Sequence, residues 1–122
     1  MANLTKEIRQ QVHAKYGGKC AYCGEDVLYK DFQADHIVPK YHFELNLPST
    51  IGLERDSLDN LIPSCRVCNK RKDTFTIEDF RKEIEMQIFR LNKYNSSYRF
   101  AKKYNLLEEK EKPIVFYFEK FL

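Results

Sequence analysis

Long apolar runs are absent from this chain of 122 residues. No stretch approaches the ~20 consecutive apolar residues that a membrane-spanning helix needs. The first residues, Met1 to Lys6, also lack the basic region and following apolar stretch of a secretory signal. We therefore expect no membrane partner and a cytoplasmic location.

Internal repeats, low-complexity tracts and a strong excess of one charge are also missing. The chain has 21 Lys and Arg against 18 Asp and Glu, for a net charge of +3. This mild excess is weak evidence for a nucleic-acid partner. With 43% hydrophobic and 32% charged residues, the composition is that of a globular protein rather than a disordered one. The length predicts one domain over residues 1–122, with a core small enough to need additional stabilisation by a disulfide or a bound metal.

Glycine and proline residues, together with short hydrophobic runs, divide the first half of the chain into short helices and strands. A helix is expected over 5–16, with a threonine cap before it and a glycine pair after it. Strands are expected over 32–38 and 60–63. The stretch 40–58 has no clean period and is predicted to be a long loop. A short basic helix should then run through Lys72.

Two Cys-x-x-Cys pairs, Cys20/Cys23 and Cys65/Cys68, use every cysteine of the chain. Each pair can place two thiolates on one metal ion from a tight turn, and together they match the Cys₄ shell of structural zinc. Two disulfides or four free thiols are the alternatives, and a cytoplasmic setting disfavours disulfides. Residues 24–64 separate the pairs, which is more than the roughly 15–20 residues of a simple zinc ribbon. We therefore expect residues with a separate chemical role in the segment between the two cysteine pairs.

Polar residues stand at set places around the cysteine pairs. Asp35 and His36 lie in the intervening segment, Asn60 shortly precedes the second pair, and Asn69 directly follows it. The combination Cys-x-x-Cys, Asp-His-Ile-x-Pro, Asn-Leu and Cys-x-x-Cys-Asn resembles the HNH endonuclease family. The resemblance covers roughly residues 9–75 and rests on several motifs together.

The resemblance implies an α+β fold with a ββα-metal core that carries the zinc site. Hydrolysing a phosphodiester needs an activated water and neutralised phosphate charge. His36 is similar to the family's general base. Asp35 and Asn69 would hold one catalytic cation, Mg²⁺ or Mn²⁺, with Ni²⁺ also suited. Asn60 would hold the loop and the orientation of the base.

The chain around Pro39 departs from a simple strand and from the family pattern. Asp35 and His36 are adjacent, so in a regular strand they would point to opposite faces, and the strand must end or bend there. Many relatives have a short glycine-containing segment after the proline, whereas Lys40 to Glu44 begins a longer insert here. We interpret His42, within it, as a surface residue.

Four cations, Arg66, Lys70, Arg71 and Lys72, flank Asn69 on the expected basic helix. Beside a scissile phosphate they would hold the backbone of a nucleic acid without reading its sequence. An ordinary solvated basic turn is the alternative interpretation. We expect phosphate contact with DNA, with RNA as an open alternative.

Residues 76–122 lie outside the resemblance and are expected to extend the 5–75 core. Hydrophobic spacing predicts a helix from 77 to about 92, a weaker helix over 97–105 and an aromatic strand over 113–121. Such a strand needs a partner, within the chain or across a homodimer. Aromatic and basic side chains interleave in this tail and are expected to pack rather than to stack on bases: Tyr94, Tyr98, Arg99, Phe100, Lys102, Lys103 and Tyr104.

Two other classes of protein compete with a nuclease. A non-catalytic, zinc-stabilised module that binds nucleic acid would keep the cysteines and the cations. It would have no need for Asp35, His36 and Asn69 together. A protein-interaction module, with zinc only as a staple, would not bind nucleic acid at low salt.

Overall fold

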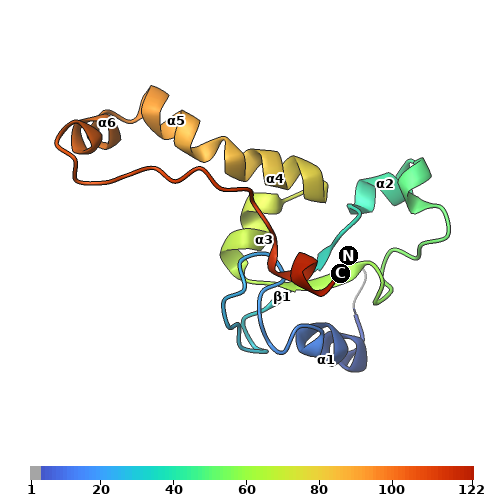
Figure 1. The fold of residues 1–122 in the computed structure, drawn as a ribbon. Coiled ribbons are helices and arrows are strands. Elements are labelled where there is room, and N and C mark those ends of the chain that lie inside the picture. Colours follow the sequence, from blue (N-terminus) through green and yellow to red (C-terminus); the bar gives the residue numbers. More distant parts are fainter. Residues whose placement is uncertain (1–3) are drawn as a thin grey trace. The chain divides into compact units, whose positions relative to one another are not determined.

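The computed structural model of the chain describes residues 4–122 and divides into two compact units. The first unit is the chain through Ile77 together with Val115–Leu122, and the second is Glu78–Ile114 (Figure 1). The end of the chain therefore returns to the first unit, which the sequence did not indicate. None of the described helices combines the length and the apolar character that crossing a bilayer requires.

Helix α1, Lys6–Ala14, begins where the sequence predicts. The Thr5 side chain accepts a hydrogen bond from the backbone N–H of Ile8 at 3.1 Å, which satisfies one of the free donors of the first turn. After the helix, Gly17 adopts a left-handed φ of 66°, a conformation that costs other residues energy. The cap and the glycine are local signals, so this element could be predicted without the rest of the fold.

Strands β1, Gln33–His36, and β2, Leu61–Ser64, pair antiparallel. In this register Asp35 lies opposite Ile62 and His36 lies opposite Leu61. Helix α3, Arg66–Lys72, follows β2 directly, so the predicted strand–strand–helix core is confirmed. The two strands are shorter than a typical strand and depend on packing for stability.

The core of the first unit lies where α1 packs against β1 and β2. Val12, Phe32 and Leu61 form a buried cluster, and Ile8 and Val27 pack against it. Burying one such side chain contributes about 1.5–3 kcal/mol. This cluster holds the two strands in register and so determines where Asp35 and His36 are presented.

The insert between the strands contains helical structure that the sequence did not predict. Helix α2, Lys40–Glu44, begins directly after Pro39, and a 3₁₀ turn, η1, covers Pro48–Thr50. Both elements are too short to show a helical period in the sequence. The expectation of a structureless loop over 40–58 is therefore wrong.

The second unit is helical. Helix α4, Ile77–Glu85, is followed by α5, Gln87–Tyr94, so the predicted single helix is two helices that meet at Met86. Neither glycine nor proline marks this break, and the sequence offers no account of it. Helix α6, Ser96–Lys103, confirms the weaker predicted helix; the Asn95 side chain caps it by accepting a hydrogen bond from the N–H of Tyr98 at 2.9 Å.

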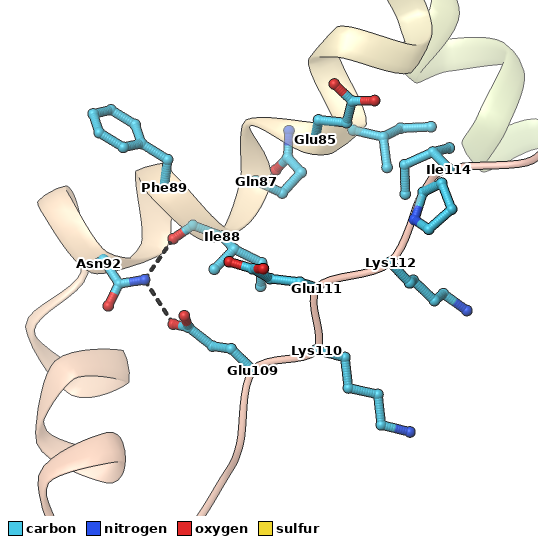
Figure 2. A pocket seen from close by; sticks show the side chains of 12 residues that line it. Glu85, Gln87, Ile88, Phe89, Asn92, Glu109, Lys110, Glu111, Lys112 and Ile114 are labelled. Carbon is cyan, nitrogen blue, oxygen red and sulfur yellow. Dashed lines mark hydrogen bonds between the residues drawn. The ribbon is translucent and has the colours of Figure 1, made fainter.

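A groove of about 920 Å³ lies between α4–α5 and the segment 109–114 (Figure 2). At one end Asn92 Nδ2 donates to Glu109 Oε2 at 2.7 Å. Hydrogen bonds from Asn92, Lys102 and Tyr98 lower the pKa of Glu109 to about 2. This ionised carboxylate ties the returning segment to α5 and α6.

Several tail aromatics are not packed. The exposed fractions of Tyr94, Phe100 and Tyr104 are 72%, 64% and 62%. The expectation that the tail buries its aromatic side chains is therefore wrong for these three. Helices α5 and α6 contain no buried residue, and these three rings lie at the surface with them.

The predicted C-terminal strand is also wrong, because Tyr117–Phe121 forms a 3₁₀ turn, η2. The backbone N–H groups of Tyr117 and Phe118 donate to the carbonyls of Tyr22 and Ala21, at 3.0 and 2.8 Å. Phe116 is buried, with its ring 5.3 Å from that of Tyr22. β-Branched and aromatic residues suited a strand, but their partner is the first cysteine turn.

Candidate functional site

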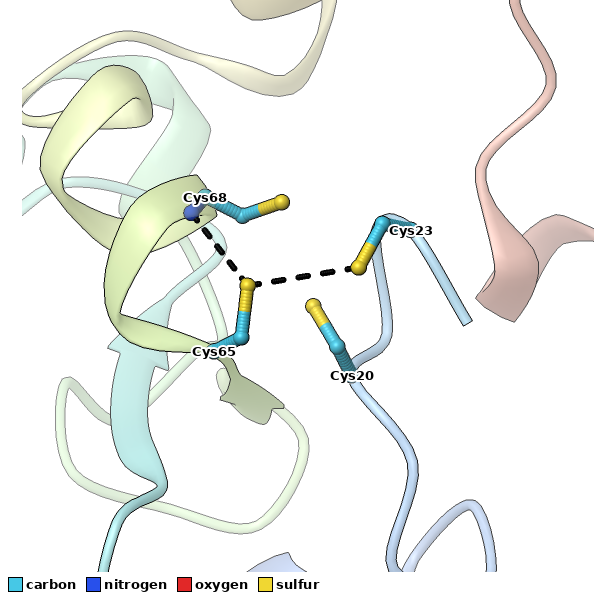
Figure 3. A group of neighbouring side chains, drawn as sticks. All are labelled: Cys20, Cys23, Cys65 and Cys68. Atoms are coloured by element: carbon cyan, nitrogen blue, oxygen red, sulfur yellow. Dashed lines mark hydrogen bonds between the residues drawn. The ribbon is translucent and has the colours of Figure 1, made fainter. Parts of the chain in front are cut away.

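The four cysteines converge from two distant turns (Figure 3). Their sulfur atoms all lie within 4.8 Å of one another, and all four are free thiols. Tetrahedral zinc with Zn–S bonds of about 2.3 Å separates its sulfurs by ~3.8 Å. The Cys23 and Cys65 sulfurs are 3.9 Å apart, so the cluster fits one zinc ion with little adjustment.

Local structure prepares these thiols for a metal. Cys65 is the N-cap of α3, and its sulfur accepts a hydrogen bond from the N–H of Cys68 at 3.4 Å. A hydrogen bond from the Cys68 thiol, aided by backbone N–H groups, lowers the pKa of Cys20 to about 4 against the effect of burial. Burial raises the pKa of Cys23 to about 11. The cluster thus already favours a thiolate at one position, and a metal ion would favour it at all four.

Asp35 is held from two sides by buried partners. Its Oδ2 accepts a hydrogen bond from the Tyr22 hydroxyl and lies 3.0 Å from Lys72 Nζ. Burial, followed by the charge of Asp35, raises the pKa of Tyr22, which therefore stays a donor. In residues 4–122 no buried side-chain oxygen or nitrogen lacks a partner, and Asp35 Oδ1 makes no hydrogen bond there. Oδ1 is consequently the oxygen left open to solvent or a cation.

Lys72 is not the surface cation that the sequence suggested. It is fully buried, and its ammonium also donates to the backbone carbonyl of His36 at 2.8 Å. The expectation that Lys72 contacts a phosphate is wrong for this conformation, because its charge is already paired inside the protein. Arg66, Lys70 and Arg71 are exposed and form no ion pair within the described part of the chain.

Replacing Lys72 should strongly destabilise the first unit. Lys72→Met leaves the Asp35 charge buried without its counterion, and breaking a buried pair in this way costs about 3–5 kcal/mol. The free energy of unfolding, measured by denaturant titration of zinc-loaded protein, should fall by that amount. The control is Lys70→Met, an exposed change on the same helix, which should stay within about 0.5 kcal/mol. Equal stability of both variants would contradict the importance of the pair.

The His36 ring faces an acidic residue that sequence reasoning missed. Its Nε2 lies 2.7 Å from Asp56 Oδ1, and both side chains are largely buried. Arg55 Nη2 lies 3.0 Å from the other oxygen of Asp56. Burial raises the pKa of Asp56, but hydrogen bonds from His36 and Arg55 outweigh it and lower the pKa below its usual value. No sequence motif marks Asp56, since it lies at the end of the irregular insert.

Asn60 is fully buried beside this pair. Its Oδ1 accepts a hydrogen bond from the N–H of Val38 at 2.8 Å. Its Nδ2 donates to the carbonyls of Val38 and Arg55, at 3.2 and 2.9 Å. One amide therefore joins the chain just after His36 to the residue just before Asp56.

Asn69 lies half-buried on α3. No hydrogen bond of its side chain occurs among residues 4–122, so its amide oxygen is available. Asn69 and Lys72 are three residues apart and share one face of the helix. Because Lys72 reaches Asp35, Asn69 lies on the face that is turned toward β1. An open carboxylate oxygen and an open amide oxygen are donors that suit a hard divalent cation.

Comparisons with known proteins bear on the family and the fold of the chain. Residues 20–75 match the family model described as HNH endonuclease. The type II-C Cas9 enzyme from Actinomyces naeslundii has a similar structure, with a TM-score of 0.50 and 22% sequence identity. The similarity covers 92% of this chain and 12% of that one, so the likeness concerns the fold and a small part of the larger enzyme. The chain matches no curated protein sequence.

Proposed function

Because residues 20–75 of this chain belong to the HNH endonuclease family, we propose that the protein is a metal-dependent endonuclease that hydrolyses DNA phosphodiester bonds. The observation that supports the proposal is that Lys72 of α3 contacts both the Asp35 carboxylate and the His36 carbonyl, so the helix that carries Asn69 packs against β1. Three groups on these elements would do the chemistry: the Asp35 carboxylate, the His36 ring and the Asn69 amide. A module that only binds nucleic acid would need none of the three.

His36 is the general base in this proposal. Its ring accepts a proton from a water molecule, and the oxygen of that water forms a bond to phosphorus. The bond between phosphorus and the leaving sugar oxygen breaks, and that oxygen takes a proton from solvent. Asp35 Oδ1 and the Asn69 amide oxygen would hold the divalent cation. When bound, Mg²⁺ or Mn²⁺ supplies charge neutralisation at the phosphate and the leaving oxygen.

Exposed cations beside the site would hold the substrate. Arg66, Lys70 and Arg71 project from α3, the helix that carries Asn69. Their contacts would be made with phosphates, so they would add affinity without sequence preference and would weaken as salt rises. Duplex DNA is the proposed substrate class, and a matched RNA substrate tests the alternative.

Cleavage of supercoiled plasmid by zinc-loaded protein tests the proposal. Added Mg²⁺ or Mn²⁺ should produce nicked or linear plasmid, and EDTA should prevent it. The zinc content is measured after the EDTA step, so that loss of the fold is distinguished from loss of the catalytic cation. If plasmid is bound but not cut under any metal condition, a zinc-stabilised binding module replaces the nuclease.

Two variants on α3 should separate cation binding from DNA binding. Asn69→Ala should raise the Mg²⁺ concentration for half-maximal cleavage by at least roughly 10-fold, because it removes a proposed ligand. Lys70→Ala should instead weaken DNA binding and its salt dependence, with the Mg²⁺ midpoint unchanged. An unchanged Mg²⁺ midpoint in Asn69→Ala would show that Asn69 is not a ligand.

A further inference from the structure

The insert that follows Pro39 ends in a carboxylate aimed at the proposed base. Asp56 Oδ1 lies 2.7 Å from His36 Nε2, and the side chains are 26% and 15% exposed. Water therefore competes little for this hydrogen bond, and a charge-assisted bond is stronger in such surroundings. The insert had no assigned purpose in the sequence, and this contact provides one.

We propose that Asp56 is the positioning residue for His36, a role that rests on the proposed nuclease function. An ionised carboxylate only accepts hydrogen bonds, so the neutral His36 ring carries its hydrogen on Nε2 and donates it to Asp56. The lone pair then lies on Nδ1, which is the nitrogen that takes the proton from water. Asp56 thus selects both the tautomer and the orientation of the ring.

Asp56 is itself held in place by the surrounding chain. Arg55 donates to Asp56 Oδ2 through Nη2 at 3.0 Å and Nε at 3.3 Å. The carbonyl of Arg55 accepts from Asn60 Nδ2 at 2.9 Å, and Asn60 Oδ1 accepts from Val38 N at 2.8 Å. The same buried amide therefore fixes both the segment that carries the base and the segment that carries its acceptor.

These contacts also argue against a second interpretation, in which Asp56 is a ligand of the catalytic cation. Both of its oxygens are engaged, one by His36 and the other by Arg55. Asp35, in contrast, keeps one oxygen open. When His36 gains the water proton, the ring becomes positively charged. The negative Asp56 carboxylate attracts it and so stabilises the protonated ring.

The test compares Asp56→Asn with Asp59→Asn, which makes the same charge change at an exposed position three residues away. The asparagine amide can donate to Nε2, which favours the tautomer with hydrogen on Nδ1 and so removes the base. Asp56→Asn should lower kcat by roughly 10²-fold. The Mg²⁺ midpoint and DNA affinity should stay unchanged, and Asp59→Asn should match the parent protein. Asp56→Glu, which retains the carboxylate, should recover part of the rate.

A spectroscopic readout keeps this test independent of cleavage. The chain has three histidines, and the His36 ring nitrogens are assigned in ¹⁵N NMR spectra by their loss in His36→Ala. The parent protein should show hydrogen on Nε2, and Asp56→Asn should shift the ring toward the other tautomer. If the parent protein does not cleave, the proposed function fails, but the tautomer still decides the role of Asp56.

Three results would overturn the inference. They are an unchanged tautomer, an Asp56→Asn rate within twofold of the parent, or a raised Mg²⁺ midpoint that would make Asp56 a ligand. Thermal unfolding of each variant establishes that the fold is retained. If Asp56→Asn unfolds, Asp56→Ala, which removes the acceptor without adding a donor, carries the same comparison of tautomer and rate.

Discussion

His36→Ala should abolish detectable cleavage, a loss of about 10²–10⁴-fold in the rate of the chemical step. The fold should survive the change, because the contacts that hold this part of β1 use backbone atoms. His36 pairs with Leu61 in the sheet, and its carbonyl accepts from Lys72 Nζ at 2.8 Å. Zinc content and DNA affinity should therefore stay near those of the parent protein.

Single-turnover cleavage of a labelled duplex, with saturating protein and Mg²⁺, is the appropriate measurement. His42→Ala is the matched control, since His42 lies in α2 of the insert and its Nδ1 is hydrogen-bonded to Ser49 Oγ at 2.7 Å. A near-parental rate for His36→Ala would show that another group is the base. Equal losses in both variants would point to a general effect on the fold.

Cys65→Ser should have the largest effect on structure. Cys65 is the N-cap of α3, and its sulfur stands in the four-thiol cluster. Structural zinc contributes about 10–16 kcal/mol in small zinc-dependent folds, and a serine hydroxyl is a poor replacement for a thiolate. Loss of zinc should release α3, and with it Asn69 and Lys72, so that both the fold and cleavage are lost.

Zinc per chain, circular dichroism and plasmid cleavage should change together in Cys65→Ser. Treating the parent protein with a strong zinc chelator should produce the same unfolded state, which distinguishes zinc loss from a side effect of the serine. Ser64→Ala, at the neighbouring position in β2, is the control that retains all four thiols. A soluble, zinc-free and fully active Cys65→Ser protein would show that the cluster is not a structural zinc site.

Sequence reasoning succeeded where the signals were local. The Thr5 cap and the glycines after α1 delimit that helix, and short hydrophobic runs mark β1 and β2. The spacing of the cysteines predicted that they converge, and their sulfurs indeed lie within 4.8 Å. Each of these features depends on a few neighbouring residues or on the shared demands of one metal ion.

Sequence reasoning failed where a distant partner decides the structure. Residues 117–121 suit a strand by composition, but the first cysteine turn provides their hydrogen bonds, and they form η2. Lys72 reads as one of four surface cations, yet the turn of α3 directs it toward β1. Hydrophobic spacing and runs of charge indicate which face of a segment is apolar and which secondary structure it favours. They do not indicate which other segment packs against that face.

The residues that make up the candidate site can be read from the sequence: four thiols for a zinc ion, an Asp-His pair, and two asparagines beside them. How these residues are arranged depends on the folded chain. Tyr22 and Lys72 take one oxygen of Asp35 and leave the other open, and Asp56 meets the His36 ring from across the insert. The reason is physical, because a buried charge must find its partner in space, and the fold brings together residues that the sequence keeps far apart.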